Sequence, residues 1–273
     1  MANVSGAWIL VLKIEEIDDR NRDRFIDLIK SDVIRHVFAF YDIQNDPAHT
    51  RIQAGFENCG LRGYILTYTA TDVPSVILEC EKGIATKLIQ FAPENHFVMH
   101  TNPSFRSIVK KRFPWAKNYL ENWMVLEKVK AHALDLKNAK RLSTKEDAAA
   151  LAKLVLNRKD RPRRNLKKYL EWVAKMPIYG VYVGNELVSY AGSFIQLPQV
   201  WLIGGVYTDP RHRNRGYAQI ATSAITREAL KNARMAALFV RSNNSPAFRV
   251  YEKIGYRKIA KKLWVDVGTG LKP

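Results

Sequence analysis

Three arginines at alternate positions, followed by a glycine, form the most informative pattern in this chain. Arg211, Arg213 and Arg215 follow the strand-like run that stops at Asp209-Pro210, and Gly216 opens a segment with helical spacing. A helix N-terminus offers partial positive charge and unpaired N–H donors, and arginines add charge-assisted hydrogen bonds. The pattern predicts a turn that binds a diphosphate. Taken alone, it is also compatible with a basic solvated loop.

A second pattern begins at Asn244 and continues through Ala247 and Tyr251 to Gly255-Tyr256. Arg213-Asn-Arg-Gly-Tyr-Ala218 resembles the acetyl-CoA signature Arg/Gln-x-x-Gly-x-Gly/Ala of the GNAT superfamily of N-acetyltransferases. The second pattern is similar to that superfamily's Asn-x-x-Ala-x-x-x-Tyr-x-x-x-Gly-Phe motif. The resemblance covers roughly residues 137–266.

The elements around these motifs must position them. A capping box at Ser143-Thr-Lys-Glu146 starts a helix, and a change from helical to alternating spacing marks the strands that follow. We expect helices at 143–155, 166–174, 218–230 and 246–253, and strands at 179–183, 187–194, 200–207, 236–240 and 256–265. The family resemblance implies an α/β (α+β) fold with a mixed, mostly antiparallel sheet flanked by helices.

The resemblance also implies roles for particular residues. Tyr251 would protonate the departing thiolate as the catalytic acid, and the alternative is that it is an aromatic core residue on a helix. The strand at 200–207 lacks the carboxylate that serves many family members as general base; Glu186 is a weak candidate, and a water chain, a residue from another element or an amine that is already neutral are alternatives. The residues expected to bind acetyl-CoA, or another acyl-CoA, as co-substrate are Val206, Tyr207, Thr208, Arg211, Arg213, Asn214, Arg215, Gly216, Tyr217, Ala218 and Asn244.

The net charge of +18 resides in the second half of the chain. Residues 137–273 hold 27 Lys and Arg against 9 Asp and Glu, whereas residues 1–136 hold 17 of each kind. A basic loop at 158–168 falls where this superfamily commonly lines its acceptor site, so we expect Arg161, Arg163 and Arg164 to bind the substrate. Such a loop suits an acidic acceptor or nucleic-acid phosphates, or it is a solvated face.

The first half has weaker signals. We expect a smaller α/β domain at 1–136, which could be a degenerate copy of the same fold, followed by the GNAT domain at 137–273. A short apolar run at 8–12 suggests an N-terminal strand. We expect helix over much of 20–40, strands at 63–69, 76–80 and 85–91, and helices or a closing strand at 105–112 and 119–129.

Composition excludes several classes of protein. No stretch of the 273 residues reaches the roughly 18 apolar residues of a membrane span. Cys59 and Cys80 are isolated, which favours reduced thiols in a cytoplasmic protein. Only His96 and His100 have a metal-like spacing, and they lack the glutamate of a His-Glu-x-x-His site, so no metal is expected. The oligomeric state stays open.

Together these features predict an acyl-CoA-dependent N-acyltransferase that moves an acyl group, acetyl by preference, directly to a primary amine. The acceptor would be a small molecule, an amino-acid-like compound or a peptide N-terminus. The two-domain layout also resembles that of glycine N-acyltransferase-like proteins. The alternatives are a nucleic-acid-associated protein, which we do not favour, and a non-catalytic acyl-CoA sensor built on the same fold.

Overall fold

The computed structural model describes residues 12–128, 138–156, 158 and 165–270. Packing divides the chain into two compact units. The first holds the residues up to Asn118 together with Leu263–Thr269, and the second holds Tyr119–Lys262 with the residues from Gly270 onward. These units have different limits from the predicted domains, 1–136 and 137–273, which stay a prediction. The suggested strand at 8–12 lies, apart from Leu12, outside the described residues.

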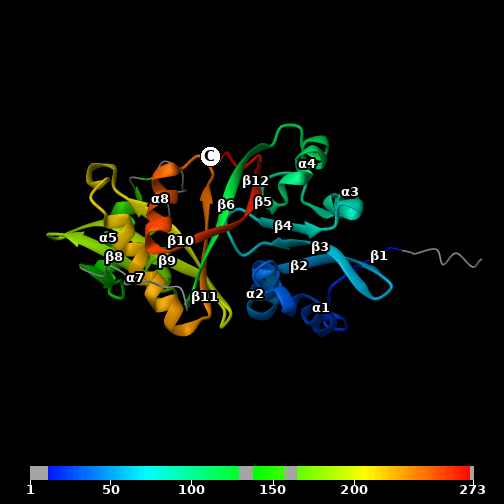
Figure 1. Cartoon of the computed structure of the whole chain (residues 1–273), viewed down its shortest axis with the longest axis horizontal. Coiled ribbons are helices and arrows are strands. Elements are labelled where there is room, and N and C mark those ends of the chain that lie inside the picture. Colours follow the sequence, from blue (N-terminus) through cyan, green and yellow to red (C-terminus); the bar gives the residue numbers. More distant parts are fainter. Residues whose placement is uncertain (1–11, 129–137, 157, 159–164, 271–273) are drawn as a thin grey trace, which may run out of the picture. The chain divides into compact units, whose positions relative to one another are not determined.

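The first unit is built on strands connected by short helices (Figure 1). Its elements in chain order are β1 (Lys13–Glu16), α1 (Arg22–Ile29), α2 (Val37–Asn45), β2 (Thr50–Glu57), β3 (Gly60–Tyr68), β4 (Ser75–Cys80), α3 (Ala85–Leu88), β5 (Phe97–Thr101) and α4 (Arg106–Arg112).

The second unit has longer strands and helices. Its elements are β6 (Lys117–Glu127, which starts at the end of the first unit), β7 (Ala139–Arg141), α5 (Lys145–Leu156), α6 (Leu166–Lys175), β8 (Ile178–Val183), β9 (Glu186–Gln196), β10 (Val200–Thr208), α7 (Tyr217–Asn232), β11 (Met235–Arg241) and α8 (Ser245–Ile254), followed by the start of β12 (Arg257–Val267).

The two units repeat one topology. Each begins with a strand, two helices and three antiparallel strands, and each continues with a helix, a strand parallel to the third of those strands, and a further helix. The strand order is β1-β2-β3-β4-β5 in the first unit and β7-β8-β9-β10-β11 in the second. The interpretation of the first half as a copy of the same fold is therefore confirmed.

The final strand of each repeat is exchanged. β6 follows the elements of the first unit in the chain, yet it pairs antiparallel with β11 from Glu121 opposite Arg241 to Glu127 opposite Met235. The second half of β12 pairs antiparallel with β5, from Leu263 opposite Thr101 to Val267 opposite Phe97. Each unit therefore takes its last strand from a part of the sequence that follows the other unit's elements.

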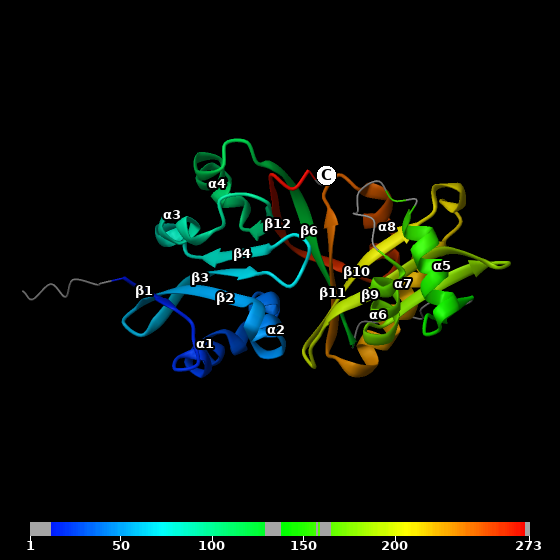
Figure 2. The same ribbon diagram turned by 180° about the vertical axis from the view of Figure 1, so that it is seen from behind.

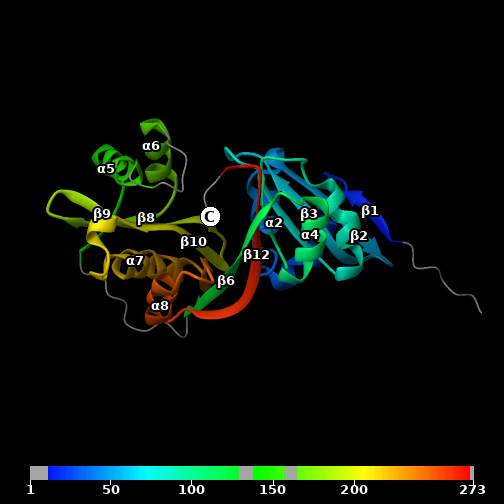
Figure 3. The same ribbon diagram turned by 90° about the horizontal axis from the view of Figure 1, so that it is seen from above.

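Helices cover both faces of the sheet in the second unit. In Figure 3, α5 and α6 lie on one side of β8–β10, and α7 and α8 lie on the other; Figure 2 shows α5 and α6 from the side on which they cover the strands. The cluster under α7 and α8 includes Val188, Ile203 and Leu238. The cluster under α5 and α6 includes Leu187 and Tyr190. Because strand side chains alternate between faces, neighbouring residues of one strand serve different clusters.

One predicted element of the first half is wrong. The strand expected at 85–91 is the helix α3 followed by a turn of 3-10 helix at Ile89–Phe91. Ala85, Leu88, Ile89 and Ala92 are all buried. Their spacing is that of a helix face rather than of a strand. The segment at 119–129, for which a helix or a strand was expected, lies mostly in the strand β6.

The capping box of α5 lies one residue later than predicted. Thr144 rather than Ser143 caps the helix, because its Oγ1 accepts from the N–H of Asp147 at 3.1 Å. The Asp147 carboxylate accepts in return from the N–H groups of Ser143 and Thr144, from Lys140 Nζ at 2.9 Å and from Tyr182 Oη at 2.8 Å. Burial alone would raise the pKa of Asp147, but these hydrogen bonds outweigh it and lower that pKa below its ordinary value.

The described helices include none that is both long and apolar enough to cross a membrane. Both cysteines are unbridged; Cys59 is exposed and Cys80 is buried. Burial raises the pKa of the Cys80 thiol to about 12.

The exchanged strand β6 can be tested by truncation. A fragment of residues 137–273 would lack β6, so β11 would lose a strand partner and the core under α7 and α8 would lose Met124 and Leu126. Removing one such buried side chain costs about 2–5 kcal/mol. We expect this fragment to be much less stable to urea than a fragment of residues 119–273. Equal midpoints would contradict the assignment of β6 to the second unit.

Stability should depend on pH through Asp147. Because folding lowers its pKa, its contribution is present above the ordinary carboxyl range and is lost as the pH falls through and below that range. Asp147→Asn should lower the free energy of unfolding by about 1–3 kcal/mol at neutral pH. The difference from wild type should shrink as the pH is lowered to about 2–3. Urea titrations across pH measure this, with Glu171→Gln on the surface of α6 as control; a difference that does not change with pH would contradict it.

Candidate functional site

The parallel strands β10 and β11 separate in the second unit. β10 pairs with β11 from Val200 opposite Met235 to Ile203 opposite Leu238. Beyond that point β11 continues beside β6, while β10 continues beside β9 as far as Thr208 opposite Ser189. After Ile203, the backbone of β10 therefore no longer pairs with β11.

A β-bulge accompanies the parting of the strands. In the β10–β9 register, Gly204 faces Gly192 and Tyr207 faces Tyr190, so that two residues of β10, Gly205 and Val206, stand opposite one residue of β9. Gly205 has φ +69°, a left-handed conformation that favours glycine. Bulges redirect backbone groups and side chains, and they are common beside active sites.

The turn after β10 leads directly into α7. Asp209 accepts from the N–H of Arg211 at 2.9 Å and so caps the short 3-10 turn Pro210–His212. Gly216, with φ +80°, occupies the N-cap position of α7, and no side chain caps this helix. A Cβ added at Gly216 would meet no atom within 4 Å. The N-terminus of a 16-residue helix therefore presents backbone N–H donors over open space.

This arrangement suits an anion. The first N–H groups of α7 have no capping side chain, the helix dipole adds partial positive charge, and a glycine leaves room for close approach. The exposed arginines Arg213 and Arg215 lie on the same turn. Arg213 Nε donates to the carbonyl of Thr208 at 3.3 Å, which ties the turn to the end of β10.

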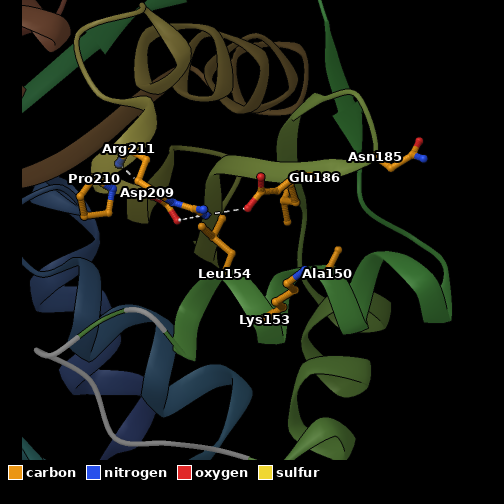
Figure 4. A pocket seen from close by; sticks show the side chains of 9 residues that line it. Ala150, Lys153, Leu154, Asn185, Glu186, Asp209, Pro210 and Arg211 are labelled. Carbon is orange, nitrogen blue, oxygen red and sulfur yellow. Dashed lines mark hydrogen bonds and ion pairs between the residues drawn. The ribbon is translucent and has the colours of Figure 1, made fainter.

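Arg211 has a different environment from the other two arginines. Its guanidinium donates to both carboxylate oxygens of Asp209 at 3.1 Å and to Glu186 at 2.7 Å (Figure 4). These hydrogen bonds, with Asp209 first and Glu186 second, raise the pKa of Arg211 above its ordinary value. The expected role of Arg211 in cofactor binding stays a prediction, and the observed contacts give it a part in holding the turn.

The weak candidate base Glu186 belongs to the same ion-pair group. Besides Arg211, its carboxylate lies 3.8 Å from His212 Nε2. Both Glu186 and Arg211 line a cavity of about 520 Å³ between α5 and the β8–β9 turn, with Lys153 and Leu154 on its helix side (Figure 4). Glu186 is therefore bound to the guanidinium of Arg211.

The second motif forms the start of α8. Asn244 is its N-cap and accepts from the N–H of Ala247 at 3.2 Å. Tyr251 is buried in the cluster under α7 and α8, and burial raises the pKa of its phenol. Val206, from the bulge, and Tyr217, from the start of α7, pack against that cluster. The structure thus gathers residues of both sequence motifs around one core.

A cluster that sequence analysis missed lies on the other face of the bulge. Arg158 Nη1 donates to Tyr190 Oη at 3.2 Å and to the carbonyl of Gly205 at 3.4 Å. Its guanidinium carbon lies 4.9 Å from the centre of the Tyr207 ring. Arg158 begins the basic loop, but its partners are distant in sequence, and nothing in the local pattern distinguishes it from the other cations.

The expected substrate-binding residues Arg161, Arg163 and Arg164 lie outside the described residues. Within the described ranges, no group of three or more His, Cys, Asp or Glu side chains could hold a metal ion.

The first unit differs at the corresponding positions. β3 and β4 pair without a register shift from Gly63 opposite Cys80 to Tyr68 opposite Ser75. The turn after β4 is Glu81-Lys-Gly-Ile84, which has one acidic and one basic side chain in place of three arginines. The repeat therefore keeps the topology but neither the bulge nor the basic turn.

Comparison with known proteins agrees with this geometry. A family model described as FR47-like protein matches residues 178–265, which include β10, the basic turn, α7 and α8. No curated protein matches the chain significantly.

Solved structures match nearly the whole chain at low identity. A Drosophila protein of 16% identity has a TM-score of 0.70 and covers 94% of this chain and 98% of its own. A GCN5-related N-acetyltransferase from Sphaerobacter thermophilus, 12% identical, has a TM-score of 0.67 with coverages of 93% and 94%. A tandem GNAT protein from the clavulanic acid biosynthesis pathway, 11% identical, has a TM-score of 0.59 with coverages of 96% and 100%.

These likenesses concern the fold. The predicted α/β fold class and the resemblance to the GNAT superfamily are confirmed, while a specific likeness to glycine N-acyltransferases is not among the findings. With its parted strands, basic turn and repeated topology, the chain has the GNAT fold, in the tandem layout that one of these neighbours also has.

Proposed function

We propose that this protein is an acyl-CoA-dependent N-acyltransferase that transfers acetyl from acetyl-CoA directly to a primary amine. The observation that carries the proposal is the uncapped N-terminus of α7, with Gly216 over open space, at the end of a strand that has parted from its parallel neighbour. A helix N-terminus of this kind binds phosphate groups, and unpaired strand backbone suits an extended amide-containing arm.

Different residues would contact different parts of the cofactor. The N–H groups from Gly216 to Ala218, with Arg213 and Arg215, would hold the pyrophosphate. The backbone of Val206 and Thr208 would pair with the pantetheine arm. Asn214 has φ +62° and Gly216 has φ +80°, and left-handed residues of this kind occur in backbone turns whose N–H groups bind anions. Tyr207, Tyr217 and Asn244 would complete the site from the neighbouring elements.

Bound acetyl-CoA supplies the acyl group and the thiolate that leaves. The N–H of Val206, directed by the bulge, would donate to the acyl oxygen as negative charge develops there. Tyr251 would donate its phenolic proton to the departing sulfur. Because burial raises its pKa, this phenol stays protonated throughout the neutral range and is available as an acid.

The acceptor amine must lose a proton, and β10 carries no carboxylate for this purpose. Glu186 is held by Arg211, so we propose that the amine arrives neutral or delivers its proton to water. Arg161, Arg163 and Arg164 are proposed to attract an acceptor that carries a negative group. A screen of amino acids, polyamines and peptide N-termini with acetyl-CoA, read by thiol release, tests the activity.

Coenzyme A binding can be tested at Gly216. Gly216→Leu would place a side chain in the space over the α7 N-terminus, and we expect the dissociation constant for coenzyme A in calorimetry to rise at least about tenfold. Gly184→Leu is a matched control, since Gly184 also has positive φ with no atom within 4 Å of an added Cβ, but it lies in the β8–β9 turn. Unchanged affinity in Gly216→Leu would overturn the assignment of the phosphate site.

The role of Tyr251 can be tested by removing its hydroxyl. Tyr251→Phe should lower kcat by about 10² to 10⁴ while the affinity for acetyl-CoA changes little. Tyr256→Phe is the control, because that hydroxyl is also buried but bonds Thr226 Oγ1 at 2.8 Å inside the core. Turnover of Tyr251→Phe close to wild type, with any accepted amine, would make Tyr251 a packing residue only.

A further inference from the structure

Three contacts of Arg158 meet at the bulge of β10. Its guanidinium reaches the carbonyl of Gly205 inside the bulge and lies over the ring of Tyr207, the first residue in register after the bulge. It also donates to the hydroxyl of Tyr190, which is the strand partner of Tyr207. One side chain that follows α5 in the chain therefore contacts the bulge and both strands that form it.

The bulge needs such support because its conformation is poorly determined by the strand ladder. A residue in the left-handed conformation interrupts strand pairing. Glycine has no side chain and can adopt other backbone conformations just as easily, so it does not fix the bulge by itself. Tyr190 limits the space on one side, since a Cβ at Gly205 would lie 3.2 Å from its ring. A planar guanidinium can donate and stack at the same time, which a lysine ammonium cannot do.

Holding the Gly205 carbonyl also fixes the next N–H. Gly205 C=O and Val206 N–H belong to one peptide group, which is trans, so the two point in opposite directions. When the carbonyl is directed at Arg158, the N–H of Val206 is directed away from it. A cation on the carbonyl oxygen also polarises the peptide and strengthens its N–H as a donor.

We propose that Arg158 is a positioning residue for acyl transfer: by binding the Gly205 carbonyl it orients and polarises the Val206 N–H that receives the acyl oxygen. The proposal rests on the proposed function and adds a residue outside both sequence motifs.

The direct test uses acetyl-CoA labelled with ¹³C at the acetyl carbonyl. Bound to the wild-type full-length protein, the carbonyl resonance should move downfield from its position in free acetyl-CoA, because a hydrogen bond polarises the carbonyl. Arg158→Ala should remove most of this shift and lower kcat about 10- to 100-fold with an accepted amine. The affinity for coenzyme A without the acetyl group should fall by a smaller factor than kcat, since the phosphate turn is untouched and only the pairing of Val206 with the pantetheine arm is affected.

Two further variants separate orientation from charge and from folding. Arg158→Lys keeps the positive charge but loses the planar guanidinium. Its carbonyl shift should lie between those of the wild type and of Arg158→Ala. Added guanidinium at millimolar concentration should restore part of both shift and turnover to Arg158→Ala but not to Arg158→Lys. Lys153→Ala, which removes an exposed cation from α5, the helix that precedes Arg158, is the matched control and should behave as wild type.

The outcomes are distinguishable. Wild type that fails to bind coenzyme A refutes the proposed function itself. Wild type that binds coenzyme A but shows no carbonyl shift refutes the role of Arg158, as does Arg158→Ala with an unchanged shift and turnover. Equal losses in Arg158→Ala and Lys153→Ala would assign the effect to general charge. If Arg158→Ala does not fold, as judged by circular dichroism, the Arg158→Lys shift decides.

Discussion

When β10 leaves β11 after Ile203, the peptide groups on that side of β10 lose their strand partner, and they must bond to a side chain, to water or to a ligand instead. The second unit meets this requirement in two ways. The bulge at Gly205 turns one carbonyl toward Arg158, and the strand soon ends in a turn whose N–H donors remain accessible. The helices α7 and α8 pack on a common core that includes Tyr251.

Charge in the basic half is not used uniformly. Asp209 and Glu186 bind Arg211 and shape the turn, whereas Arg213 and Arg215 stay exposed beside the helix N-terminus. The carboxylates near the turn thus neutralise the cation that would otherwise repel its neighbours. Which arginine is neutralised depends on which one the turn brings near Asp209. Three arginines at alternate positions therefore need not have the same role.

Local signals predicted most elements of the second half because its strands and helices are long, and Gly and Pro punctuate them clearly. The run at 85–91 misled because a four-residue helix gives a pattern too short to separate from a strand. The cap of α5 shifted by one residue because Ser143 and Thr144 are equivalent by type, and only the contacts of Asp147 separate them. Arg158 could not be identified, since its partners lie 32 and 47 residues away.

The exchange of β6 and β12 has a consequence for synthesis on the ribosome. β5 pairs with β4 on one edge, but its other edge has no partner until residues 263–267 emerge, and these come after every helix of the second unit. The edge of β5, with Phe97 and Met99, is therefore exposed throughout translation of the second unit, a state open to aggregation or to chaperone capture. The N-terminal repeat is made first but must be completed last.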